Sequence, residues 1–209
     1  MRRFSYVAGA TAFALVCALS AVAQSISLPA PQTTGGKPLM QALTERRTTR
    51  AFRDEALPPQ TLSNLLWAAF GVNRPRSVKP GLGRTAPSAM NKQEVELYVV
   101  LAKGVYVYDA EADTLKPVVD GDARAKVGSG DAAHAAATIV YVAPAGIDYA
   151  QVDVGFIGQN VYLFAASQGL NAWFYALHGA QDAAAVASAL HLGADKRPLY
   201  AQSVGYPPQ

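Results

Sequence analysis

The chain has a single cysteine, Cys17, and it lies in an N-terminal stretch that we expect to be removed. Residues 1–23 place two arginines ahead of an apolar run and end on Ala21-Val22-Ala23, which is typical of a secretory signal peptide. The run from Val7 to Leu19 is shorter than the about 20 apolar residues that a spanning helix needs. We expect cleavage after Ala23 and an exported chain, periplasmic or secreted, without disulfide, thiolate nucleophile or cysteine metal ligand.

Net charge is also scarce. Removing residues 1–23 takes away two arginines and no acid, so the formal charge falls from +3 to +1 over the remaining 186 of 209 residues. A near-neutral chain argues against a nucleic-acid partner, and we expect no membrane span in the mature chain. The arginine pair is compatible with either general secretion or twin-arginine export of a folded protein, and the sequence leaves both open.

Several catalytic signatures are missing. No G-x-S-x-G elbow and no G-x-G-x-x-G dinucleotide fingerprint occurs. The three histidines, His134, His178 and His191, are scattered and match no metal-ligand spacing, so we predict no metal site.

The remaining sequence predicts one α+β domain over 37–209, preceded by a flexible lead-in at 24–36. Apolar periodicity and turn residues predict helices and a mixed, mainly antiparallel sheet. The helices are expected at 37–46, 58–70, 132–137, 148–168 and 182–191, and the strands at 94–101, 105–108, 115–119, 138–143, 171–177 and 199–204. A long loop is expected at 72–93.

The expected helix 148–168 is apolar nearly all round. Such a helix is buried in a large core or in a subunit interface. Its glycines, Gly155 and Gly158, would let another helix approach closely.

Three arginines gather in the stretch Arg46-Arg47-Thr48-Thr49-Arg50. On a helical turn Arg46 and Arg50 would share a face, a guanidinium binds phosphate oxygens in pairs, and Thr48 offers a hydroxyl. The stretch is either a phosphate clamp or a solvated basic helix end, which would suit the helix dipole.

A second polar stretch, Pro87-Ser88-Ala89-Met90-Asn91-Lys92-Gln93, lies in the long loop. The amides of Asn91 and Gln93 suit a ring whose edge alternates donors and acceptors. The alternative is a turn asparagine that bonds its own backbone. Together with a phosphate clamp, the loop suggests a phosphorylated heterocyclic cofactor.

The order of these motifs resembles the nitroreductase superfamily of flavin enzymes. The resemblance is carried by Arg-Arg-Thr-x-Arg-x-Phe after a first helix and by Pro-Ser-Ala-x-Asn-x-Gln before a strand, and it covers about residues 38–208. The runs from Gly83 to Ala89 and from Glu96 to Asp109, and the ending Val204-Gly205-Tyr206-Pro207, look most like the branch of thiazoline and oxazoline dehydrogenases.

The resemblance implies a nitroreductase-like fold and a homodimer, with the long helix at its interface and two FMN sites there. Carried over by position, the residues at the FMN phosphate and ribityl chain would be Arg46, Arg47, Thr48 and Arg50. Those that the partner places at the isoalloxazine would be Pro87, Ser88, Ala89, Asn91 and Gln93. Ala176 and Leu177 would lie near the reactive edge of the ring. His178 follows that edge and is either a proton donor or structural.

The implied activity is hydride transfer between flavin N5 and a small organic substrate stacked on the ring; the alternative is a flavin or flat-ligand binding protein without turnover. The chain ends without the basic residue that many relatives add to the phosphate clamp. Since NAD(P)H is a cytosolic pool, an exported enzyme is expected to use another electron donor, or to pass electrons to oxygen or a redox partner.

Overall fold

A computed structural model describes residues 24–74, 83–146 and 149–209. Its centre is a seven-stranded sheet in the order β1-β6-β5-β4-β7-β9-β8, and every neighbouring pair in it is antiparallel. The strands are β1 (Ile26–Ser27), β4 (Glu96–Leu101), β5 (Gly104–Asp109), β6 (Thr114–Asp120), β7 (Ala137–Pro144), β8 (Asn171–Ala176) and β9 (Lys196–Gly205). This confirms the predicted α+β class with a mainly antiparallel sheet.

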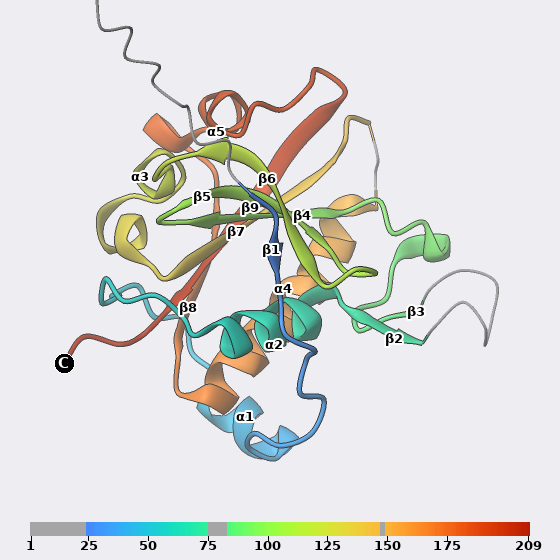
Figure 1. The fold of residues 1–209 in the computed structure, drawn as a ribbon, viewed down its shortest axis with the longest axis vertical. Coiled ribbons are helices and arrows are strands. Elements are labelled where there is room, and N and C mark those ends of the chain that lie inside the picture. Colours follow the sequence, from blue (N-terminus) through green and yellow to red (C-terminus); the bar gives the residue numbers. More distant parts are fainter. Residues whose placement is uncertain (1–23, 75–82, 147–148) are drawn as a thin grey trace, which may run out of the picture.

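Helices cover both faces of the sheet (Figure 1). One face carries α2 and α4, with α1 packed against α4, and the other carries α3 and α5. Their bounds are α1 (Leu39–Glu45), α2 (Pro59–Phe70), α3 (Arg124–Val127), α4 (Ala150–Gln168) and α5 (Ala183–Ala189). Side chains of β4 alternate between the two layers, since Leu97 and Val99 enter the core under α2 and α4 while Tyr98 and Val100 enter the other.

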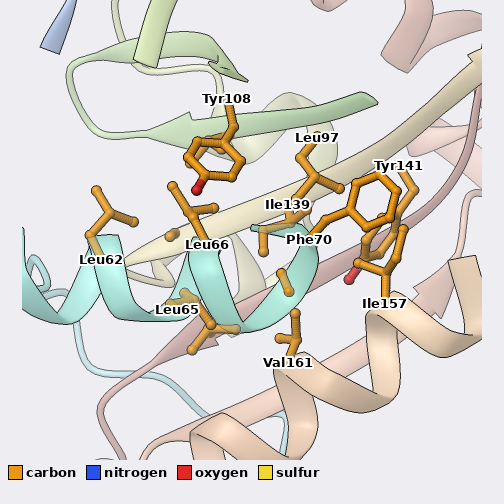
Figure 2. Packing of buried hydrophobic residues seen from close by; sticks show 14 of the residues in the cluster. Leu62, Leu65, Leu66, Phe70, Leu97, Tyr108, Ile139, Tyr141, Ile157 and Val161 are labelled. Atoms are coloured by element: carbon orange, nitrogen blue, oxygen red, sulfur yellow. The ribbon is translucent and has the colours of Figure 1, made fainter. Parts of the chain in front are cut away.

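Helix α2 shows how the sequence specifies one of these elements. Pro59 occupies its first turn, where a missing N–H costs nothing, and Gly71 ends it as predicted. Leu65 and Leu66 are fully buried against the sheet and α4 (Figure 2), and burying each stabilises the fold by about 1.5–3 kcal/mol.

Three segments differ from the sequence-based expectation. The stretch 24–36 is no free lead-in, because β1 pairs with β6 and Leu28 is buried. The expected loop 72–93 carries a small hairpin of β2 (Val72–Arg74) with β3 (Gly83–Arg84) and a short 3-10 turn, Ala89–Asn91. The expected helix 132–137 is a 3-10 turn, Gly130–His134, followed at once by β7.

The predicted long helix is present as α4, although its expected cap Asp148 lies outside the described residues. Gly158 packs against Phe174 and Gln202 of the sheet and not against another helix, and a Cβ built on Gly155 would meet nothing within 4 Å. Among the described helices, none combines the length and hydropathy needed to span a bilayer.

Candidate functional site

The 46–50 segment is extended and not helical. Helix α1 ends at Glu45, and Arg46 already has ψ of 127°. Thr49 then pairs with Ala172 at the start of β8: its N–H donates to the Ala172 carbonyl at 2.9 Å, and its hydroxyl accepts the Ala172 N–H at 3.0 Å. Arg46 and Thr48 both contact Tyr162, whereas Arg50 lies over Trp173 of β8, so the predicted helical turn is not what positions the arginines.

Tyr162 of α4 is the common support of this segment. Its hydroxyl lies 3.0 Å from the hydroxyl of Thr48 and accepts the backbone N–H of Phe174 at 2.8 Å. The guanidinium of Arg46 lies 5.4 Å from the centre of its ring. Contacts of this kind hold a guanidinium while leaving its N–H donors available.

Arg50 is supported in the same way, 5.2 Å from the ring centre of Trp173 on β8. Among the described residues, no carboxylate forms an ion pair with Arg46, Arg47 or Arg50. Arg47 and Arg50 are exposed and Arg46 is half-buried. The segment therefore presents three guanidinium groups whose charge this part of the chain does not neutralise.

Arg47 lines a pocket of about 190 Å³ between α1, the end of α4 and β8, and Tyr162 lines the same pocket. Lys37 lines the same pocket and is paired with Glu45. Lys37 is thus a further cation beside the arginines, and sequence reasoning did not assign it to the site.

The 84–93 loop is held in an uncommon backbone conformation. Met90, Asn91 and Gln93 have φ values of 51°, 54° and 54°, a region that costs non-glycine residues about 1–3 kcal/mol each. Such positions cluster at ligand sites because the surroundings must enforce them. Here Ser88 accepts the Gln93 N–H at 2.8 Å, and its carbonyl accepts the Asn91 N–H at 2.9 Å.

Two buried or half-buried charges tie this loop to the helices. The carboxylate of Asp153, on the first turn of α4 and 1% exposed, accepts the Ala89 N–H at 3.1 and 3.2 Å. Arg84 donates to the Phe70 carbonyl and lies 5.0 Å from the ring centre of Phe70 at the end of α2. Pro87 and Asn91 are exposed beside these anchors, and Ser88 and Ala89 are half-buried.

The two motifs are attached to different places on α4. Asp153 holds the 84–93 loop and Tyr162 holds the 46–50 segment, and nine residues of α-helix separate them by about 13 Å along the axis. Within the described residues, the two motifs are therefore attached at separate points along the same helix.

The end of β8 carries the third predicted group. Ala176 and His178 are exposed, whereas Leu177 packs against the core layer under α5. Trp173, which supports Arg50, lies three residues before Ala176 on the strand, a separation of about 10 Å. The structure places His178 at the surface, as the cap of a short 3-10 turn.

Sequence reasoning missed Tyr162, Asp153 and Arg84. Asp153 had a usable signal, since it is the only charged residue in the nineteen residues of α4, and a lone acid in an apolar helix needs a partner. Tyr162 and Arg84 gave no local signal, because their roles depend on which segments fold against them. In the described part of the chain no three His, Cys, Asp or Glu side chains group as metal ligands would.

Comparisons with known proteins show the family of this chain. A model of the nitroreductase family matches residues 43–206. A protein named "putative nitroreductase MJ1384" from Methanocaldococcus jannaschii is 31% identical over 153 residues, which are 63% of this chain and 75% of that one. The chain belongs to the nitroreductase family.

Solved structures give the same result. A "putative nitroreductase" from Ralstonia eutropha JMP134 matches with a TM-score of 0.78 and 33% identity over 88% of this chain and 90% of the other. An FMN-dependent nitroreductase from Clostridium difficile R20291 matches with a TM-score of 0.56 and 18% identity over 81% and 88%, a likeness of fold alone. The predicted family and fold are confirmed. The thiazoline and oxazoline dehydrogenase branch stays a prediction.

Proposed function

We propose that this protein is an exported, homodimeric FMN-dependent oxidoreductase that transfers a hydride between the flavin and a small organic substrate. The observation that carries the proposal is the 46–50 segment. Arg46 and Thr48 are held at Tyr162 and Arg50 at Trp173, and neither arginine has a carboxylate partner among the described residues. Uncompensated arginines in fixed positions suit a phosphate dianion.

The residues present fit FMN at both ends of the molecule. Guanidinium and hydroxyl donors of the 46–50 segment would hold the phosphate and ribityl chain. Ser88, Ala89 and Asn91, on a loop held with positive φ at its tip, would line the ring. FMN, when bound, supplies the hydride-accepting and hydride-donating ring; the protein's part is to bind and orient it and to exclude water.

The homodimer is proposed from apolar exposure. The described large apolar side chains that are exposed all lie on α1, on the N-cap or N-terminal half of α4, or on the 84–93 loop: Leu39, Met40, Leu43, Met90, Tyr149, Val152 and Phe156. Large apolar side chains exposed on neighbouring elements are a surface that a partner could cover. If α4 of two copies packs antiparallel about a two-fold axis, the loop held by Asp153 of one copy comes beside the clamp held by Tyr162 of the other.

Export is proposed from residues 1–23, which lie outside the described residues. If the protein works outside the cytosol, its electron donor or acceptor is a redox partner, oxygen or a small molecule other than NAD(P)H. Strong NADPH-linked turnover of the mature protein, or a cytosolic location, would count against this part of the proposal.

A spectroscopic experiment tests the cofactor. Purified protein, freed of unbound FMN, should be yellow, and dithionite followed by air should bleach and restore its flavin absorption. Protein that stays colourless and takes up no added FMN would contradict the proposal. Bound flavin that no donor or acceptor can cycle would favour a flavin-binding protein without turnover.

A further inference from the structure

The side chains of Arg84, Gln93 and Asn91 form a chain of hydrogen bonds across the 84–93 loop. The Nε–H of Arg84 donates to Oε1 of Gln93 at 2.8 Å, and Nε2 of Gln93 donates to Oδ1 of Asn91 at 2.8 Å. Arg84 is itself fixed by its contacts with the carbonyl and the ring of Phe70. Asn91, at the far end, is exposed.

The direction of this chain follows from chemistry and not from how the amides are drawn. A guanidinium has donors and no acceptor, so the Gln93 atom that meets Arg84 must be its oxygen. The other end of the Gln93 amide is then an NH₂ group, which can only donate. The Asn91 atom that meets it must therefore be oxygen, and the NH₂ group of Asn91 is the end left for a ligand.

We propose that Arg84 is a positioning residue which, through Gln93, commits Asn91 to present hydrogen-bond donors to its ligand. The ligand atom opposite Asn91 is then an acceptor: a carbonyl oxygen or an unprotonated ring nitrogen of the flavin edge, not its N3–H. Ser88 adds to this polarity, because its oxygen already accepts the Gln93 N–H and its hydrogen remains a donor. The ligand assignment rests on the proposed function.

A substitution at Gln93 that keeps the side chain's shape can reverse the direction of these hydrogen bonds. In Gln93→Glu the carboxylate still accepts from Arg84, but its second oxygen can only accept, so Asn91 must turn its NH₂ toward residue 93 and its oxygen toward the ligand. Asn91→Asp places an acceptor outward more directly. Arg84→Lys keeps a donor-only partner and hence the original direction. The hydrogen bonds from Arg84 through Gln93 to Asn91 are called the relay below. Lys92→Gln, at an exposed neighbouring position, makes the same charge change as Gln93→Glu without altering a residue of the relay.

The direction of the hydrogen bonds in the relay is tested first without cofactor, by NMR of the side-chain amides in the flavin-free protein. In wild type, the Gln93 NH₂ should be protected from solvent exchange and the Asn91 NH₂ should exchange freely. In Gln93→Glu the Asn91 NH₂ should become protected, and in Arg84→Lys the wild-type pattern should persist. An Asn91 NH₂ equally protected in wild type and Gln93→Glu would overturn the relay.

FMN titration then tests the ligand assignment. Gln93→Glu and Asn91→Asp should weaken FMN binding at least tenfold and lower the midpoint potential of the bound flavin, because an acceptor faces the ring where a donor stood. Lys92→Gln should stay within about threefold of wild type. Equal effects of Gln93→Glu and Lys92→Gln would show a charge effect and overturn the assignment. If wild type binds no FMN, the proposed function fails, while the amide pattern still decides the relay.

Discussion

At the scale of single residues, the site depends on side chains that neighbouring groups hold in place. Arg46 and Arg50 lie over aromatic rings, and Tyr162 accepts an N–H of β8 while it contacts Thr48. Each guanidinium is thereby held in place before a ligand arrives. Holding side chains in their bound positions reduces the entropy lost on binding.

Removing either arginine should weaken phosphate binding selectively. We expect Arg46→Ala and Arg50→Ala each to raise the Kd of FMN roughly 10- to 100-fold, the worth of a charge-assisted hydrogen bond. Riboflavin, which lacks the phosphate, should bind wild type and variants within about threefold. Fluorescence titration with both ligands measures this, and Lys126→Ala, an exposed cation on α3, is the control. Equal losses for riboflavin and FMN would show that the arginines do not contact the phosphate.

A second residue-scale prediction concerns acid stability. The Arg124 side chain is 8% exposed and donates to Asp122 and Asp54, and its hydrogen bonds hold the pKa of Asp122 below its usual range. The stability from this pair is complete above the unfolded pKa, about 3.9, and is lost as the pH falls through the lower folded pKa. Asp122 is 45% exposed, so solvent screening reduces the contribution.

We expect Asp122→Asn to lower the free energy of unfolding by about 1–2 kcal/mol at pH 7, and to flatten the fall of Tm below about pH 4. Thermal melts of wild type and variant across the acid range measure both. Asp131→Asn, which neutralises an exposed aspartate, serves as the control. Parallel Tm profiles for wild type and Asp122→Asn would contradict the coupling.

At the scale of elements, α4 does most to organise the site. It buries Ile157 and Val161 against α2 and the sheet (Figure 2), and it carries the anchors of both motifs. Gly158 lets it lie close to β8, since a Cβ there would come 3.0 Å from the Phe174 ring.

Two glycines on α4 should therefore respond oppositely to alanine. Gly158→Ala should lower the free energy of unfolding by about 1 kcal/mol, because overpacking outweighs the gain in helix propensity. Gly155→Ala should raise it by about 0.5–1 kcal/mol, because its Cβ has room. Urea denaturation of the two variants measures the difference. Stabilisation by both would show that Phe174 moves aside freely.

The sequence predicted most elements because their signals are local. Pro59 and Gly71 mark the ends of α2, and the valine-rich run of β4 marks a buried strand. The sequence-based prediction failed where pairing with a distant segment decides the local structure. Strand β1 is two residues long and forms only because β6 offers an edge, and the 46–50 segment stays extended because Thr49 pairs with Ala172.

The residue types of the candidate site could be proposed from the sequence, but the contacts between its side chains could not. The arginines and the 84–93 loop were visible as motifs. Gln93 was predicted to meet a ring edge, but its side-chain amide forms hydrogen bonds with Arg84 and Asn91. A side chain's partners at long range are set by packing, so a motif indicates which residues matter without saying which of them touch a ligand.

At the scale of the whole molecule, the described chain leaves both halves of the proposed site open. The 46–50 segment and the 84–93 loop are anchored about 13 Å apart on α4, and the exposed apolar side chains lie on the same helix, on α1 and on the loop. A two-fold partner would cover that surface and bring the two halves together. Dimer formation and cofactor binding should therefore be lost together.

Phe156, 45% exposed on α4, is the place to test this. Phe156→Glu should set two carboxylates near the proposed two-fold axis and weaken the dimer roughly 100-fold, because a buried aromatic contact is lost and unpaired charge is buried. Analytical ultracentrifugation should show monomers at micromolar concentration, with a circular dichroism spectrum unchanged from wild type. Ala194→Glu adds the same charge on an exposed turn before β9 and should remain dimeric.

FMN titration of the same variant separates a shared site from a merely adjacent one. If the partner's 84–93 loop lines the ring, monomeric Phe156→Glu should lose FMN affinity at least as strongly as Arg46→Ala, although every clamp residue is intact. Raising the protein concentration should restore dimer and FMN binding in parallel. A monomer that binds FMN as wild type does would place the whole site within one chain and contradict the two-subunit arrangement.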